Sequence, residues 1–166
     1  MATNNITRLL DAKQIPYLVF ELPAEKLSAR DTARILNVPL EQVFKTIVVQ
    51  REGKGKPILA VVPGSAEVDL KLLAKALDEK KLHLPTEREA EQLTGLQSGG
   101  ISPLALINKG FQVVLDSRAG EFREIHISGG QRGLNICLPV DALVSLTNAR
   151  LETIIHLTEG HDFLRM

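Results

Sequence analysis

Aromatic residues and cysteines are scarce in this sequence of 166 residues. It has no tryptophan, one tyrosine and one cysteine, and aromatic residues make up 4% of the chain. A single cysteine, Cys137, excludes an intramolecular disulfide and a cysteine-based zinc cluster, and its apolar neighbours predict a small buried side chain. With so few rings, we do not expect a surface that stacks many nucleobases. The core is therefore expected to be aliphatic, and hydrophobic residues, at 44%, suffice to build it.

An excess of charge of one sign is also absent. The 20 lysines and arginines balance the 20 aspartates and glutamates. This balance disfavours a protein that holds DNA by bulk attraction to phosphates. No apolar run approaches the length of a membrane span, and the first five residues lack the pattern of a signal peptide. We therefore expect a cytoplasmic protein that binds neither a membrane nor DNA.

The sequence shows no metal-binding pattern. The spacing of the histidines does not fit a motif such as His-x-x-x-His, and the acidic residues are scattered, so we expect no metal and no cofactor. His126 alternates with Ile125 and Ile127, which predicts that it lies on the polar face of a strand. The chain holds four histidines in all: His83, His126, His156 and His161.

Hydrophobic patterns indicate a mixture of hairpins and helices. No Gly-x-Gly-x-x-Gly follows a predicted strand, which disfavours a doubly wound nucleotide-binding fold. We predict one α+β domain over residues 1–166, with a mixed, curled β-sheet surrounded by helices. Capping-box patterns at Ser28 and Thr86 mark two helix starts, and further helices are expected near residues 5, 69 and 139. Strands are predicted over residues 17–22, 44–50, 58–62, 111–116, 124–128, 134–138 and 153–157.

Lys45 is unusual for its position in the predicted strand 44–50. Alternation puts Phe44, Thr46 and Val48 on one face and Lys45 on the other, and both faces are apolar further along. The strand is therefore expected to be central. A lysine there suits contact with a bound anion or carbonyl, and the alternative is a strand-end lysine whose ammonium group reaches water.

Two glycine-containing segments are further candidates. Residues 99–103, Gly-Gly-Ile-Ser-Pro, can bring backbone amides close to a ligand, where they could donate to a developing oxyanion, or they can form a plain loop. Ser102 lacks the Gly-x-Ser-x-Gly frame of a nucleophile elbow. Residues 128–133, Ser-Gly-Gly-Gln-Arg-Gly, resemble a hairpin turn, and Arg132 could bind a phosphate or carboxylate there or simply be solvated.

Together these segments are more specific than each alone. In order and spacing, residues 43–46, 68–77, 99–104 and 128–134 resemble the YbaK family of free-standing aminoacyl-tRNA editing proteins, which is related to the insertion domain of bacterial prolyl-tRNA synthetase. The resemblance runs from about residue 6 to residue 155. It implies a mixed sheet curled towards a barrel, with helices outside.

The resemblance also implies the site. Lys45 would contact the substrate, and Gly99 and Gly100 would supply backbone donors to the ester carbonyl as the catalytic set. The implied substrate-binding residues are Thr46, Ile101, Ser102, Pro103, Gly129, Gly130 and Arg132.

The implied activity is trans-editing of mischarged tRNA. In the branch of Cys-tRNA(Pro) deacylases, which can extend to Cys-tRNA(Cys), the cysteine thiol closes on its own ester and leaves a thiolactone. The implied partners are the 3′ end of the aminoacyl-tRNA and a prolyl-tRNA synthetase. Two alternatives stay open at this stage: a water-using deacylase for Ala- or Ser-tRNA, and a non-catalytic module that binds tRNA or a synthetase.

Overall fold

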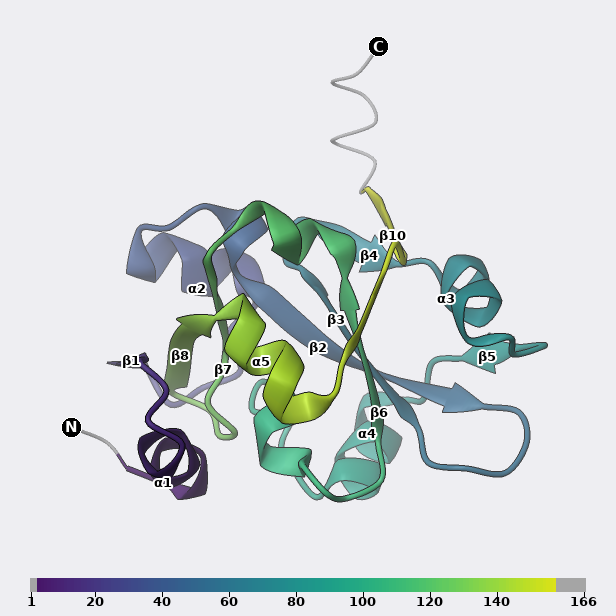
Figure 1. Cartoon of the computed structure of the whole chain (residues 1–166), viewed down its shortest axis with the longest axis horizontal. Helices are drawn as coiled ribbons and strands as arrows, with labels where there is room; N and C mark the ends of the chain where they lie inside the picture. The colour runs from purple at the N-terminus through teal and green to yellow at the C-terminus, as the bar shows by residue number, and fades with distance from the viewer. Residues whose placement is uncertain (1–2, 158–166) are drawn as a thin grey trace, which may run out of the picture.

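The computed structural model describes residues 3–157, which form two main sheets and a separate two-stranded pair, packed with helices (Figure 1). The larger sheet has five strands. Its β2–β3 pair is antiparallel, whereas β3–β6 and β6–β9 are parallel, so the sheet is mixed as predicted. Its strands, in spatial order, are β5 (Leu82–His83), β2 (Phe44–Arg51), β3 (Ile58–Pro63), β6 (Gln112–Asp116) and β9 (Arg150–Glu152).

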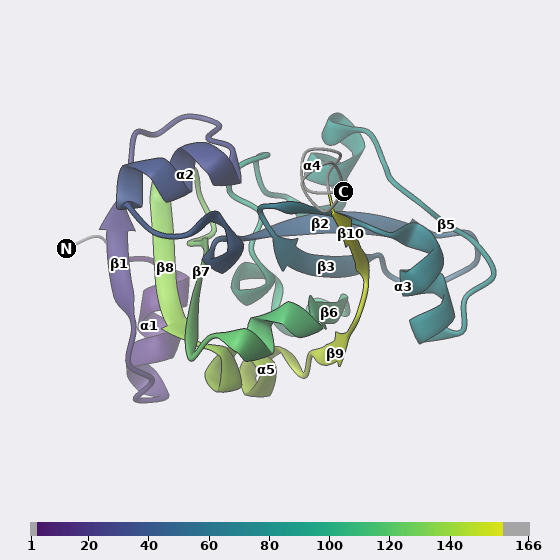
Figure 2. The same ribbon diagram turned by 90° about the horizontal axis from the view of Figure 1, so that it is seen from above.

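The smaller sheet is antiparallel and crosses the end of the larger one (Figure 2). A parallel bridge between Val43 and His126 joins the two sheets beside the start of β2. The strand pairing of the larger sheet is thus linked to that of the smaller one at this bridge. The strands of the smaller sheet are β1 (Leu18–Glu21), β8 (Leu134–Pro139) and β7 (Glu124–Ser128), and a separate pair is formed by β4 (Ala66–Val68) and β10 (Ile155–Leu157).

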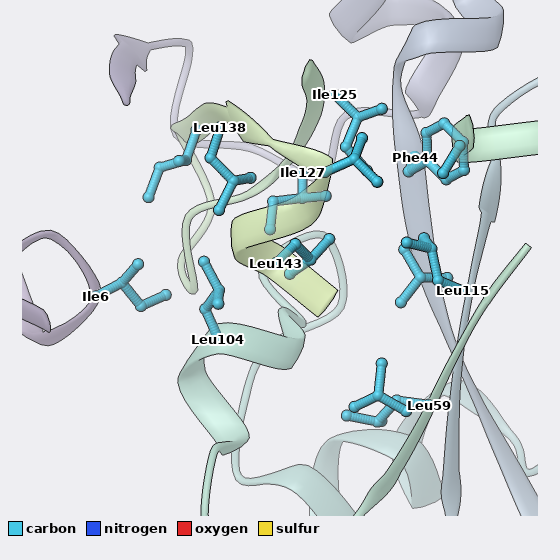
Figure 3. Packing of buried hydrophobic residues seen from close by; sticks show 14 of the residues in the cluster. Ile6, Phe44, Leu59, Leu104, Leu115, Ile125, Ile127, Leu138 and Leu143 are labelled. Atoms are coloured by element: carbon cyan, nitrogen blue, oxygen red, sulfur yellow. The ribbon is translucent and has the colours of Figure 1, made fainter. Parts of the chain in front are cut away.

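Two aliphatic cores cover the two faces of the larger sheet. Phe44 and Val48 of β2 point into the first core, whereas Val49 points into the second, which confirms the predicted alternation along β2. In the first core, β7 and β8 pack against the larger sheet and against helices at both ends (Figure 3). Its fully or nearly fully buried members include Ile6, Leu59, Leu104, Leu115, Ile125, Ile127, Leu138 and Leu143. Each such aliphatic side chain stabilises the fold by about 1.5–3 kcal/mol through burial.

The helices begin at the caps that the sequence predicted. Ser28 and Thr86 each accept the backbone N–H three residues on, and Asp31 and Glu89 return the bond, so both capping boxes are confirmed. The α-helices are α1 (Asn5–Ala12), α2 (Ala29–Leu36), α3 (Leu70–Leu77), α4 (Glu87–Thr94) and α5 (Val140–Thr147). Three 3₁₀ turns, η1 (Leu40–Gln42), η2 (Pro103–Leu106) and η3 (Ser117–Glu121), complete the elements.

The sequence patterns did not predict three short strands, β4, β5 and β9. The expectation that β2 is a central strand is corrected, because β5 covers only its end. With only two residues, β5 pairs with Gln50 and Arg51 alone. At Lys45, β2 is therefore paired with β3 on one side and has no β5 residue on the other. In residues 3–157, no helix combines the length and the apolar character that crossing a bilayer requires.

Candidate active site

A cavity of about 540 Å³ opens where the two sheets meet. Its volume lies in the range of small-molecule sites. Five parts of the chain line it: the segment 22–32, which includes the first turn of α2; the start of β2; Gly64 and Glu67 around the β3–β4 connection; residues 97–103, called the glycine loop below; and the ends of β7 and β8. The lining thus brings together segments that are more than a hundred residues apart in the sequence, from Leu22 to Asn135.

Lys45 lies in the cavity lining, as the resemblance implied. Its ammonium Nζ is 3.4 Å from the Glu67 Oε1 of β4, and the Lys45 side chain is 27% exposed. The lysine is therefore neither fully buried nor free in water. The sequence does not predict Glu67 as a site residue because β4 has only three residues, and the apolar–polar–apolar pattern Ala66-Glu67-Val68 is a weak signal.

Thr46 lines the same cavity beside Lys45. Neighbours on a strand point to opposite faces, yet both residues line this cavity, which lies beside the part of β2 that β5 does not pair with. The Thr46 hydroxyl is buried and has no hydrogen-bond partner among residues 3–157. A hydroxyl in this state offers a donor and an acceptor to a bound molecule.

The glycine loop presents Gly99, rather than Gly100, to the cavity. The Gly100 N–H donates to the Gln97 carbonyl at 2.8 Å and Gly100 is buried, which corrects the expectation that both amides face the substrate. The Gly99 N–H donates to no acceptor in the described part of the chain. A Cβ on Gly100 would lie 2.8 Å from the Gln131 Cα, so this glycine is required by close approach of the 128–133 turn.

Most of the other proposed substrate-binding residues lie outside the cavity lining, with Ile101 the exception. Ser102 is fully buried and caps η2 by accepting the Leu104 N–H. Arg132 donates through Nε to the Ser98 carbonyl at 2.7 Å, so it contacts the loop next to Gly99. The remaining residues of this group, which pack behind the site or form the 128–133 turn, are Pro103, Gly129 and Gly130.

Ser128 and Asn135 line the cavity where the 128–133 turn joins β7 and β8. Asn135 is buried, and its Oδ1 is 2.9 Å from Nδ1 of His126. His126 is itself only 4% exposed and lies beside the Phe20 ring, with 5.6 Å between ring centroids. The expectation that His126 lies on a polar face of β7 is thus wrong: this face is covered as well, and Asn135 is the hydrogen-bond partner of Nδ1 of His126.

Cys137 is buried, as predicted, and is not part of the cavity lining. Burial raises the pKa of its thiol to about 11, with the negative charge of Glu124 and a hydrogen bond to it as smaller causes. The thiol is therefore neutral near pH 7 and unsuited to nucleophilic attack. Among residues 3–157, no three histidine, cysteine or acidic side chains are grouped to hold a metal ion.

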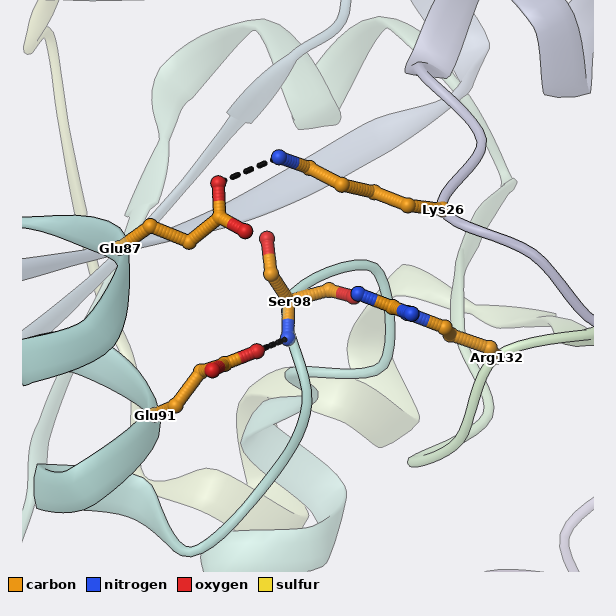
Figure 4. Close-up of polar contacts among 5 residues, drawn as sticks. All are labelled: Lys26, Glu87, Glu91, Ser98 and Arg132. Atoms are coloured by element: carbon orange, nitrogen blue, oxygen red, sulfur yellow. Dashed lines mark hydrogen bonds and ion pairs between the residues drawn. The ribbon is translucent and has the colours of Figure 1, made fainter.

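The segment 22–28 is tied across to α4 (Figure 4). Lys26 forms an ion pair with Glu87 at the start of α4, and both side chains are about half exposed. Lys26 lines the cavity, so this contact links one part of the lining to the helix that precedes the glycine loop.

Comparison with known proteins gives one consistent family. The sequence matches the family model "Aminoacyl-tRNA editing domain" over residues 24–146. A protein of Enterococcus faecalis named "Putative Cys-tRNA(Pro)/Cys-tRNA(Cys) deacylase EbsC" is 36% identical over 152 residues, which are 90% of this chain and 92% of that one. A proline–tRNA ligase of Streptococcus thermophilus is 26% identical over 139 residues, 82% of this chain but 22% of the ligase.

A solved structure has the same fold. The "crystal structure of a putative trans-editing enzyme for prolyl tRNA synthetase" aligns with a TM-score of 0.77 and 23% identity, over 94% of this chain and 99% of that one. The α+β fold that the resemblance implied is therefore confirmed. The chain belongs to the aminoacyl-tRNA editing domain family.

Proposed function

We propose that the protein is a free-standing deacylase that clears mischarged tRNA, with Cys-tRNA(Pro) as its main substrate and Cys-tRNA(Cys) as a second. The observation that carries this proposal is that Lys45 and Gly99 line one cavity, and that the Gly99 N–H has no acceptor among residues 3–157. A cation and a backbone donor are the groups that hold an ester and stabilise its oxyanion. The relative EbsC, which is 36% identical, carries the same activity in its name.

In the proposed reaction, the thiol of the substrate cysteine gives up its proton to solvent, and its sulfur attacks the carbonyl carbon of its own ester. The Gly99 N–H stabilises the negative oxygen of the tetrahedral intermediate, while Lys45 and Thr46 hold the aminoacyl end. The bond to the terminal ribose oxygen then breaks, and that oxygen takes a proton. The products are a cysteine thiolactone and a tRNA with a free terminal hydroxyl. Binding in a fixed geometry is the main contribution of the protein, because an ester is already activated.

A second candidate has one observation in its favour. The carboxylates of Glu67 and Glu25 line the cavity, and a carboxylate there could accept a proton from an attacking water. The substrate would then be an alanyl or seryl ester without a thiol. Glu67, however, is already engaged by Lys45. We therefore favour attack by the substrate thiol.

We further propose that residues 1–166 act as one editing domain in the cytoplasm, with the 3′ end of tRNA as ligand and prolyl-tRNA synthetase as partner. The balanced charge of the chain supports the need for a partner, because prolyl-tRNA synthetase would supply the affinity for tRNA that a chain without net positive charge lacks. The test is a panel of mischarged tRNAs (Cys, Ala and Ser on tRNA(Pro), and Cys on tRNA(Cys)) incubated with the protein, with and without prolyl-tRNA synthetase. Loss of the cysteinyl ester alone supports the proposal, and no loss from any substrate refutes it.

A further inference from the structure

The glycine loop contains a turn with one peptide unit that can point in two directions. Residues 97–100 form a β-turn closed by the Gly100 N–H and the Gln97 carbonyl. Gly99, the third residue, has φ +90°, and Ser98, the second, is not among the residues with positive φ. These angles define a type II turn. Turn types I and II differ by a rotation of the central peptide plane of roughly 180°. Here that peptide carries the Ser98 carbonyl and the Gly99 N–H.

Both backbone polar groups of Ser98 are held by side chains from other elements (Figure 4). Glu91 of α4 accepts the Ser98 N–H at 2.7 Å, and the Arg132 Nε donates to the Ser98 carbonyl at 2.7 Å. Hydrogen bonds to charged groups are stronger than neutral ones. Of the four backbone groups in the peptides 97–98 and 98–99, three have partners, and the Gly99 N–H is the one that has none in the described residues.

The Arg132 contact fixes the direction of the Gly99 N–H. In a trans peptide the carbonyl and the following N–H point in opposite directions. The Ser98 carbonyl points to Arg132, which is not part of the cavity lining, whereas Gly99 is. The N–H therefore points away from Arg132. Without the Arg132 bond, a flip to the type I turn would give Gly99 a negative φ, which glycine adopts as easily as a positive one, and would redirect the donor.

We propose that Arg132 is a positioning residue for the reaction: it locks the Ser98–Gly99 peptide so that the Gly99 N–H is available to the ester oxyanion. This inference rests on the proposed deacylase function. It replaces the earlier expectation that Arg132 binds the substrate. Those two roles differ in kinetics, because an oxyanion donor acts on kcat whereas a contact to phosphate acts on KM and on its dependence on salt.

The kinetic test compares three variants in the full chain. Arg132→Ala should lower kcat on Cys-tRNA(Pro) by on the order of 10²-fold, the value of one oxyanion donor, with KM little changed. Arg132→Lys, which keeps a donor of similar reach, should restore part of kcat. Gly99→Ala has room for its Cβ, with the nearest atom at 3.4 Å, but disfavours φ +90° and should lower kcat in the same way. The matched control is Arg88→Ala, which removes an exposed arginine of α4 and should change nothing.

Because Gly99 and Arg132 both act on the Ser98–Gly99 peptide, the effects of their substitutions on kcat should not add. The Gly99→Ala/Arg132→Ala double variant should fall no more than roughly threefold below the lower single variant. Two results would overturn the inference. One is an Arg132→Ala variant whose loss of kcat/KM comes only from a higher KM, with kcat unchanged. The other is full additivity of the two effects in the double variant.

A second readout needs no substrate and separates this inference from the proposed function. In a crystal structure of Arg132→Ala, the φ of Gly99 should change sign; a φ that stays near +90° would overturn the inference even if activity falls. If Arg132→Ala does not fold, Arg132→Lys is used for both measurements. A wild-type protein that cleaves none of the substrates would refute the deacylase proposal, while the crystal structure would still decide whether Arg132 controls the peptide.

Discussion

Nζ of Lys45 lies 3.4 Å from Oε1 of Glu67, and this contact joins β2 to β4 in the lining of the cavity. Glu67 is 58% exposed and Lys45 is 27% exposed. An ion pair with such access to water contributes about 0–1 kcal/mol to the free energy of unfolding. Its place in the cavity therefore matters to the proposed reaction more than to the stability of the fold.

Removing the charge of Lys45 should abolish activity and leave the fold intact. We expect Lys45→Ala, and Lys45→Met, which keeps an unbranched stem, to lose deacylation. The reason is that the aminoacyl end then has no cation to hold it. Deacylation rates and urea unfolding of each variant provide the measurement.

Glu67→Gln is the matched control for Lys45. It breaks the same ion pair but retains the ammonium group, so most of the activity should remain. If Lys45→Met keeps the wild-type rate, Lys45 is not part of the site. If Glu67→Gln is as inactive as Lys45→Met, water attack with Glu67 as the base becomes the better account.

A side chain on Gly100 should destabilise the protein. An added Cβ would lie 2.8 Å from the Cα of Gln131, 2.9 Å from its carbonyl carbon and 3.0 Å from the Arg132 backbone nitrogen. All three are backbone atoms, so the 128–133 turn itself would have to shift. Gly100→Ala is expected to lower the free energy of unfolding by about 1–3 kcal/mol. Gly53→Ala, where no atom lies within 4 Å of the added Cβ, should be close to neutral in the same urea titration. Equal stability of the two variants would show that the contact of the two loops is looser than described.

Cys137 should be inert in the folded protein. Its thiol pKa is raised from 9.0 to about 11, mainly by burial, so the folded state favours the neutral thiol. That contribution to stability is complete below pH 9 and is lost as the pH rises through about 11. Iodoacetamide at pH 8 should therefore label Cys137 slowly in the native protein and rapidly in urea, and Cys137→Ala should keep its deacylase activity. Rapid labelling of the native protein with loss of activity would contradict this.

Asn135 should matter for stability through His126. Asn135→Ala would leave Nδ1 of the buried imidazole without its 2.9 Å partner. An unsatisfied buried polar group costs about 1–3 kcal/mol. The thermal midpoint of Asn135→Ala should fall accordingly, whereas the double variant with His126→Phe should recover part of the loss, because both polar groups are then removed. A double variant less stable than Asn135→Ala would contradict the pairing.

Local signals explain which features were predictable from the sequence. The capping boxes at Ser28 and Thr86 and the alternation of Phe44 and Val48 in β2 depend on neighbours in the sequence, and all are confirmed. The short strands β4, β5 and β9 have two or three residues each and are defined by distant pairing. The contact of Lys45 with Glu67 depends on one of them, and for that reason it was not predicted.

The glycine loop lines the cavity, but which of its amides faces the cavity was not predictable from the sequence. Which of Gly99 and Gly100 faces the cavity depends on the type of turn and on contacts from α4 and from the 128–133 turn. Arg132 was read as a substrate contact because its partner, the Ser98 carbonyl, is 34 residues away. Such side-chain to backbone contacts leave no periodic pattern in a sequence.

The central claim, attack by the thiol of the substrate, is tested most directly by comparing Cys-tRNA(Pro) with Ala-tRNA(Pro) under identical conditions. The two differ by one sulfur atom, and the alanyl ester has no side-chain nucleophile. The account predicts rapid cleavage of the cysteinyl ester with release of cysteine thiolactone, survival of the alanyl ester, and slow cleavage of Ser-tRNA(Pro), because a hydroxyl is less ionised and less nucleophilic than a thiol. Comparable turnover of the alanyl and cysteinyl esters would contradict it and indicate attack by water.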